Sequence, residues 1–203
     1  MEFVEVEHKF VVPDIDAALG RITELRAESR GASRFQCDVY YDAPDRSFLA
    51  NPKSSEWLRL RFESDTVTLS YKLWHPVAAE VKSHCDEFET IVSNDQAMER
   101  ILTALGYREL VVVSKTRQEW RLGDTLIAID LVRDLGHFIE LEYVGDATTV
   151  DEAHRQLTAT VELLDLDLGP RSTGYPHQLL ARVNAGSNAV PALPDASASL
   201  SAT

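Results

Sequence analysis

The residues Glu5-Val6-Glu7-His8-Lys9 place three charged side chains at alternate positions near the start of the chain. On a β-strand alternate side chains point to the same face, so Glu5, Glu7 and Lys9 would form one row. Two carboxylates in such a row repel each other unless a positive charge lies between them. Because hard cations such as Mg²⁺ prefer carboxylate oxygens, the row is a candidate metal site. A solvated strand face would show the same alternation, so the rest of the chain has to decide.

Later stretches repeat the alternation, and each carries mostly one sign of charge. The acidic pairs are Glu87/Glu89 and Glu140/Glu142, the basic pairs are Arg59/Arg61 and Lys115/Arg117, and Lys72 and Asp130 each end a row. Solvated faces usually mix signs, because like neighbours cost a few tenths to about 1 kcal/mol. Arginine forks match phosphate oxygens, and lysines add compact point charges. The segregation therefore predicts a concave site, with an acidic wall for metal ions and a basic wall for a polyanion.

The elements that must position these rows follow from periodicity and turn residues. Strands are predicted over 2–12, 33–42, 56–63, 66–74, 79–92, 109–122, 125–132 and 137–144, with hairpins at Ser64-Asp65 and Gly123-Asp124. Helices are predicted after Asp14, after the capping boxes Ser93–Gln96 and Thr149–Glu152, and from Pro176. This is an α+β pattern, a large antiparallel sheet that can close into a barrel with helices outside. In a closed barrel the polar faces would line a tunnel.

The bulk composition is that of a globular protein with an acidic surface. The 203 residues are 44% hydrophobic and 26% charged, and the formal net charge is −13. This charge argues against binding to nucleic acids or anionic membranes. The chain lacks an apolar run of membrane-spanning length and a signal-peptide core, and Cys37 and Cys85 lack metal-ligand spacing, so we expect a cytoplasmic protein. Residues 1–185 are predicted to form one domain, and the Gly-, Ser-, Ala- and Pro-rich residues 186–203 a disordered tail.

Taken in order along the chain, the charged rows resemble the CYTH superfamily, which includes thiamine triphosphatases, inorganic triphosphatases and class IV adenylyl cyclases. The resemblance spans about residues 2–180 and rests on an ExExK signature at Glu5, Glu7 and Lys9, on Leu58-Arg59-Leu60-Arg61, Lys72, Glu87-Phe88-Glu89, Lys115-Thr116-Arg117, Asp130 and the residues 135–142. It implies a closed eight-stranded antiparallel β-barrel with helices packed outside. The tunnel would bind a triphosphate together with Mg²⁺ or Mn²⁺.

The resemblance also implies a role for each charged row. The metal ligands would be Glu5, Glu7, Asp130, Glu140 and Glu142, with Glu87 and Glu89 as further candidates. The triphosphate contacts would be Lys9, Arg59, Arg61, Lys72, Lys115 and Arg117. Glu7 and Lys72 are the candidate catalytic residues, with Lys72 as a general base whose pKa neighbouring cations would lower. A plain phosphate contact explains Lys72 equally well.

One segment departs from the family pattern, and a few aromatic residues need an interpretation of their own. Many relatives carry a lysine where this chain reads Ser172-Thr173-Gly174-Tyr175-Pro176-His177, so either Arg171 or His177 substitutes or the contact is missing. Either Tyr40 or Tyr41 could face the tunnel. We expect His8 to pack on the outer face, and Trp57, Trp74 and Trp120 to cover the barrel.

These observations favour metal-dependent hydrolysis of inorganic triphosphate or thiamine triphosphate by a monomer or homodimer. The first alternative is a class IV-type adenylyl cyclase, in which the ribose hydroxyl of ATP replaces water and the products are cyclic AMP and pyrophosphate. The sequence shows no clear adenine pocket, so the cyclase ranks second. The other alternative is a non-catalytic polyphosphate-binding module, which would not require the acidic pairs.

Overall fold

The computed structural model describes residues 4–49, 55–77 and 81–184 of the chain. The strands are β1 (Val4–Glu5), β2 (Glu7–Val11), β3 (Glu28–Ser29), β4 (Arg34–Asp42), β5 (Glu56–Glu63), β6 (Thr66–Val77), β7 (Val81–Ile91), β8 (Arg108–Leu122), β9 (Thr125–Val132) and β10 (Gly136–Tyr143). The helices are α1 (Ile15–Glu24), α2 (Asp95–Ala104), α3 (Val150–Leu164) and α4 (Tyr175–Asn184). The predicted tail 186–203 lies outside the described residues and stays a prediction.

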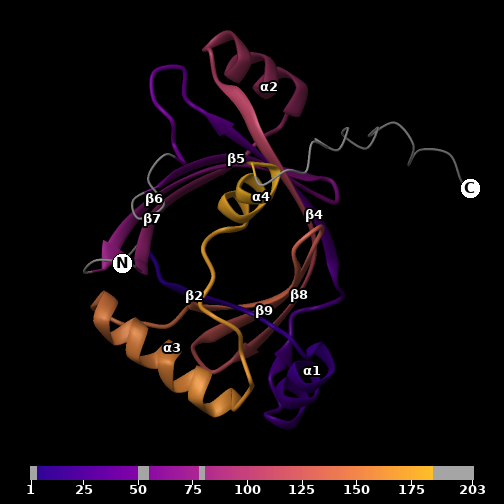
Figure 1. Ribbon diagram of the computed structural model, residues 1–203, viewed down its shortest axis with the longest axis vertical. Helices are drawn as coiled ribbons and strands as arrows, with labels where there is room; N and C mark the ends of the chain where they lie inside the picture. Colours follow the sequence, from indigo (N-terminus) through magenta and orange to yellow (C-terminus); the bar gives the residue numbers. More distant parts are fainter. Residues whose placement is uncertain (1–3, 50–54, 78–80, 185–203) are drawn as a thin grey trace, which may run out of the picture.

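The strands form one antiparallel sheet that curves into a nearly closed barrel (Figure 1). Their order is β1-β7-β6-β5-β4-β8-β9-β10-β2, with β3 paired to β8. Glu5 of β1 lies opposite Cys85 of β7, whereas Lys9 of β2 lies opposite Glu140 of β10. The N-terminal segment therefore joins both ends of the sheet. With β1 and β2 counted as one strand the ring has eight strands, which confirms the predicted barrel.

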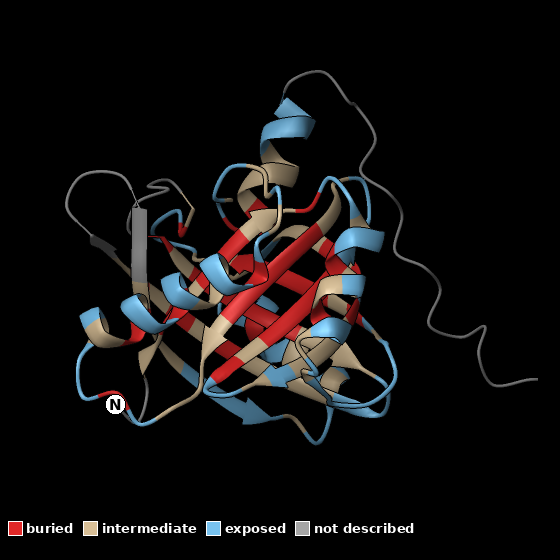
Figure 2. Ribbon diagram, turned by 90° about the horizontal axis from the view of Figure 1, so that it is seen from below, coloured by how far each residue is buried: buried red, intermediate tan, exposed pale blue. Residues whose placement is uncertain are grey.

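Helices cover much of the outer face of the barrel, and the strands beneath them are largely buried (Figure 2). Phe35, Phe88 and Leu131 on the same outer face are exposed. Helices α1 and α3 pack on one cluster, which includes Val6, Ile139 and Leu141, and α2 contributes Leu102 to a second cluster. Because side chains alternate along a strand, the residues between these apolar ones point into the barrel. Burial of the outer face thus fixes the charged rows toward the lumen.

Helix α4 lies across one end of the ring (Figure 1). Its Tyr175 and Leu179 pack with Trp57, Trp74 and Phe138 in a cluster on the inner side of the strands. The expectation that Trp57 and Trp74 cover the outside is therefore wrong, because they continue the inward rows of Arg59 and Lys72. Trp120 does pack outside, against the cluster beneath α1 and α3.

The helix ends agree closely with the sequence signals. Asp14 and Thr149 cap α1 and α3 as predicted, accepting hydrogen bonds from the backbone N–H groups of Ala17 and Glu152. Helix α2 is capped by Asn94 and not by Ser93, since the Asn94 side chain accepts from the N–H of Ala97. Within the described residues, no helix is long and apolar enough to cross a lipid bilayer.

Outside the barrel, His8 packs as predicted. Its Nε2 lies 2.9 Å from Nδ1 of His154 on α3, and the two rings stack. Burial, with help from Arg171 and His154, lowers the pKa of His8 to about 3. The imidazole therefore stays neutral, as a residue at a helix–sheet contact should.

Candidate functional site

The lumen holds a cavity of about 530 Å³ whose wall is dominated by charge. Thirteen of the eighteen lining residues are charged, and none is Asn, Gln, Ser or Thr. Twelve of the thirteen predicted site residues are among them: Glu5, Glu7, Lys9, Arg59, Arg61, Lys72, Glu87, Glu89, Lys115, Arg117, Glu140 and Glu142. The alternation in the sequence therefore located the cavity, although Glu119 on its wall was not predicted.

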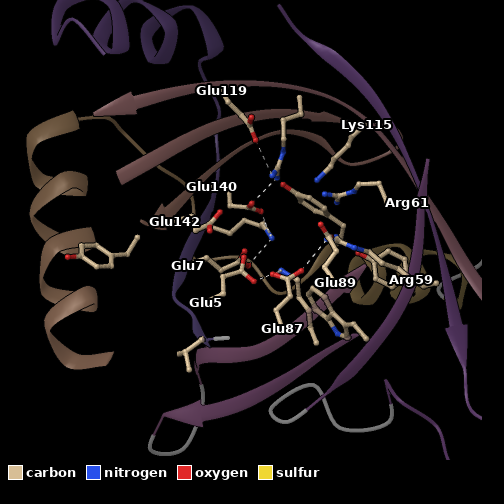
Figure 3. A pocket seen from close by; sticks show the side chains of 18 residues that line it. Glu5, Glu7, Arg59, Arg61, Glu87, Glu89, Lys115, Glu119, Glu140 and Glu142 are labelled. Carbon is tan, nitrogen blue, oxygen red and sulfur yellow. Dashed lines mark hydrogen bonds and ion pairs between the residues drawn. The ribbon is translucent and has the colours of Figure 1, made fainter. Parts of the chain in front are cut away.

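An acidic wall follows the strands on both sides of the barrel closure. It consists of Glu5, Glu7, Glu87, Glu89, Glu140 and Glu142, from β1, β2, β7 and β10 (Figure 3). These strands are neighbours because β1 pairs with β7 and β2 pairs with β10. The register places Glu142 directly opposite Glu7. Closure of the ring thus gathers carboxylates that lie more than a hundred residues apart in the chain.

A basic wall consists of Arg59, Arg61, Lys72, Lys115 and Arg117, from β5, β6 and β8. Figure 3 shows Arg59, Arg61 and Lys115 across the cavity from Glu5, Glu7 and Glu142. Arg59 and Arg61 share the carboxylate of Asp38 on β4, which lies between β5 and β8. Lys115 and Arg117 in turn share Asp130 on β9. Each basic pair is therefore held from behind by one aspartate. The sequence analysis gave Asp38 no role, although it is in phase with the inward row of β4.

Asp130 is the one predicted site residue that does not line the cavity. It is fully buried, and its two oxygens accept from Nε and Nη2 of Arg117 at 2.7 Å each, from Lys115 at 3.3 Å and from the Tyr175 hydroxyl at 2.8 Å. Burial would raise the pKa of Asp130, but Lys115 and Arg117 lower it to about 2. With both oxygens occupied by donors, this arrangement favours orientation of the basic pair and does not support metal ligation.

Two lysines lie between carboxylates. Lys9 is 3.1 Å from Glu7 and 2.8 Å from Glu140, and Lys72 pairs with Glu5 and, at 3.2 Å, with Glu87. Burial alone would lower the pKa of Lys72, but Glu5 and its other anionic neighbours raise it well above the ordinary value. The predicted lowered pKa of Lys72 is therefore wrong, because its partners across the closed ring are acids.

Lys115 has the property that was expected of Lys72. Burial and the adjacent Arg117 outweigh the attraction of Asp130 and lower the pKa of Lys115 to about 7. Its ammonium group can therefore lose a proton near neutral pH. The signal in the sequence was Arg117, a second cation in the same row.

The two carboxylates of β10 have opposite electrostatic environments. Burial would raise the pKa of Glu140, but Arg117 and Lys9 hold it well below its usual range. Burial and then the charge of Glu5 raise the pKa of Glu142 to about 8. The pKa of Glu7 is likewise raised, by burial and by Glu140. The region around Glu5, Glu7 and Glu142 thus holds more carboxyl groups than its lysines can neutralise, and Glu142 stays largely protonated at pH 7.

These carboxylates suit a hard divalent cation by donor type and charge. Among the described residues, no three His, Cys, Asp or Glu side chains are arranged around one point closely enough to hold an ion by themselves. Mg²⁺ does not require such a cage, because it usually keeps several waters and binds one or two carboxylates together with substrate phosphates. Glu5, Glu7 and Glu142 therefore fit such an ion as part of its ligand set, with water and substrate phosphates as the other ligands.

Neither candidate for the missing C-terminal lysine reaches the cavity. Arg171 donates to the backbone carbonyl of Glu7 at 3.1 Å, and His177 packs against Trp57. Tyr40 lines the cavity, whereas Tyr41 packs into the outer cluster with Leu102. The choice between the two tyrosines is thereby decided for Tyr40.

The sequence model of the CYTH domain matches residues 4–169. A protein named "Putative adenylate cyclase MJ0240" from Methanocaldococcus jannaschii is 27% identical over 161 residues, 79% of this chain and 87% of its own. "Adenylate cyclase CyaB" from Aeromonas hydrophila is 29% identical over 152 residues, 75% of each chain. The solved structure of the PH1819 protein from Pyrococcus horikoshii superposes with a TM-score of 0.71 at 25% identity, covering 88% of this chain and 98% of that one. The chain belongs to the CYTH domain family.

Proposed function

We propose that this protein is a divalent-metal-dependent triphosphatase that hydrolyses inorganic triphosphate or a small triphosphate ester such as thiamine triphosphate. The observation that supports this most is the wall of the cavity, where thirteen of eighteen residues are charged. Such a wall suits a substrate that consists almost wholly of phosphate. The other five lining residues are Val4 and the aromatics Tyr40, Trp57, Tyr143 and Tyr175, and the wall has no Asn, Gln, Ser or Thr, the neutral side chains that commonly bind the edge of a nucleobase.

In this proposal the basic wall binds and orients the phosphate chain. Arg59, Arg61 and Arg117 donate to phosphate oxygens, and Lys72 and Lys9 add positive charge. Phosphoryl transfer depends chiefly on such positioning and charge neutralisation. A Mg²⁺ or Mn²⁺ ion held by Glu5, Glu7 and Glu142 would supply further neutralisation of phosphate charge and would acidify a bound water.

The reaction itself is attack of water on a terminal phosphorus. The new P–O bond forms as the anhydride P–O bond breaks, the attacked group becomes orthophosphate, and the leaving diphosphate takes the bonding electron pair. The water proton passes to a base, and we assign this role to Lys115 in place of Lys72. The Lys115 amine lines the cavity and has a pKa of about 7, so a large fraction is unprotonated at neutral pH.

The second candidate is adenylyl cyclase activity. It is favoured by the names of the two curated relatives, which match three quarters or more of this chain. The same cavity would then bind the triphosphate of ATP, and the ribose hydroxyl would replace water.

The product distinguishes these candidates. Purified protein with Mg²⁺ or Mn²⁺ is incubated with tripolyphosphate, thiamine triphosphate or ATP, and orthophosphate, pyrophosphate and cyclic AMP are measured. Orthophosphate release from tripolyphosphate supports the triphosphatase, whereas cyclic AMP with pyrophosphate from ATP would overturn it. Tight tripolyphosphate binding without turnover would favour a binding module. Arg59→Ala should weaken triphosphate affinity more than monophosphate affinity, and Arg46→Ala, an exposed arginine paired with Glu56 outside the cavity, is the control.

A further inference from the structure

Asp38 is a buried carboxylate behind the basic wall, and both of its oxygens accept from arginines of that wall. It is 1% exposed and does not line the cavity. Its Oδ1 and Oδ2 accept from Nε and Nη2 of Arg61 at 2.7 Å each, and Oδ2 also lies 3.4 Å from Nη1 of Arg59. Burial would raise the pKa of Asp38, but Arg61 and Arg59 hold it below its ordinary range. One ionised carboxylate thus holds two guanidinium groups.

These contacts fix the orientation of both forks. The bidentate pair sets the plane of the Arg61 guanidinium, since two parallel N–H···O bonds allow one geometry. Arg59 is held by Asp38 and by the Ser70 hydroxyl, which accepts from its Nε at 2.8 Å. Both arginines nevertheless line the cavity, so their remaining N–H groups are available to a ligand there.

We infer that Asp38 is a positioning residue that holds Arg59 and Arg61 as a paired binding site for linked phosphate groups. This inference rests on the proposed function. It adds an explanation of how the site would select a chain of phosphates over a single phosphate. Alternate residues of a strand are about 7 Å apart. A single phosphate can form a bidentate contact with only one of the two guanidinium groups, whereas two linked phosphates can contact both.

For the variant Asp38→Asn, this inference and simple electrostatics predict opposite changes in the affinity for tripolyphosphate. Asp38→Asn removes a negative charge beside two cations, so electrostatic attraction alone would make an anion bind more tightly. Loss of the bidentate contact instead lets the Arg59 and Arg61 guanidinium groups move. The affinity for a phosphate chain that contacts both groups should then fall. Removing a residue that orients a metal ligand typically costs about 10- to 100-fold in affinity, and we expect a loss of this order for a residue that orients two phosphate-binding arginines.

The test is calorimetric titration of tripolyphosphate and of orthophosphate into the metal-free protein. For Asp38→Asn we expect at least about tenfold weaker binding of tripolyphosphate, and a change below about threefold for orthophosphate. The matched control is Asp42→Asn on the same strand, whose carboxylate accepts from the N–H of Phe48. The control should bind both anions like the wild type. Unchanged or tighter tripolyphosphate binding by Asp38→Asn would overturn the inference.

Two further variants keep the test decisive. Asp38→Glu restores the carboxylate and should recover part of the lost affinity. Ser70→Ala removes one hydrogen bond to Arg59 without changing charge, and should weaken tripolyphosphate binding in the same direction. If Asp38→Asn does not fold, unchanged affinity in Ser70→Ala refutes the inference. Because binding is measured without turnover, a wild type that binds but does not hydrolyse tripolyphosphate would refute the proposed function alone.

Discussion

Binding of a divalent cation to the acidic wall should release nearly one proton at neutral pH. Burial and Glu5 raise the pKa of Glu142 to about 8, so at pH 7 this carboxyl carries about 0.9 proton. A carboxylate must be deprotonated to bind a metal. Titration with Mn²⁺ should therefore release about 0.9 proton at pH 7 and only about 0.1 at pH 9. The number of protons released per bound ion is obtained by calorimetry in two buffers with different heats of ionisation.

Two variants test the assignment of that proton. Glu142→Gln should remove most of the release at pH 7, whereas Glu119→Gln, a carboxylate of the same cavity that pairs with Arg34 and Arg117, should keep it. The contribution of Glu142 to the stability of the metal-free protein should also fall as the pH rises from about 4.5 to 8, because this carboxyl binds more protons in the folded state than in the unfolded state in this window. The difference in thermal midpoint between the wild type and Glu142→Gln isolates this contribution from those of His8 and Lys115, which have the opposite sign. Mn²⁺ should restore the thermal midpoint at pH 8. Release below about 0.3 proton at pH 7, or equal release at pH 7 and 9, would refute this reasoning.

Three other variants have defined outcomes. Glu7→Gln should abolish metal-dependent phosphate release without changing the thermal midpoint by more than a few degrees; turnover within a few-fold of wild type would count against the acidic wall. Turnover should rise as the pH passes about 7, the pKa of Lys115, and Lys115→Arg should lose this rise; an unaltered pH profile in the variant would exclude Lys115 as the base. In Gly174→Ala the new Cβ would clash with the Trp57 indole, so either the indole or the start of α4 must shift, and the free energy of unfolding measured in urea should fall by about 1–3 kcal/mol. An unchanged unfolding midpoint would contradict the close packing of α4 against Trp57 at this end of the barrel.

Alternation and turn residues were enough to predict the strands and the inward direction of the charges. Rows such as Glu140-Leu141-Glu142 have only one orientation that buries the apolar residue, so burial itself selects the face that lines the tunnel. The family resemblance then predicted the closed ring, which the pairing of β1 and β2 with opposite sheet ends confirms.

What the sequence could not provide was the set of neighbours across the barrel. Lys72 pairs with Glu5 only because the ring closes, so its raised pKa is invisible in either local segment. Alternation likewise cannot distinguish an inward aspartate on the cavity wall from one behind it. Asp130, to which the family resemblance gave a metal role, and Asp38, which was given no role, both lie behind the wall.

The segment Val4–Val11 has a consequence for assembly. It supplies Glu5, Glu7 and Lys9 to the cavity and also the pairing partners of β7 and β10. A molecule in which this segment has not docked would lack three ligand-binding side chains and would expose two sheet edges, which are templates for aggregation. The barrel and its binding site are therefore completed in the same folding step. Partly folded molecules should aggregate before they can bind substrate.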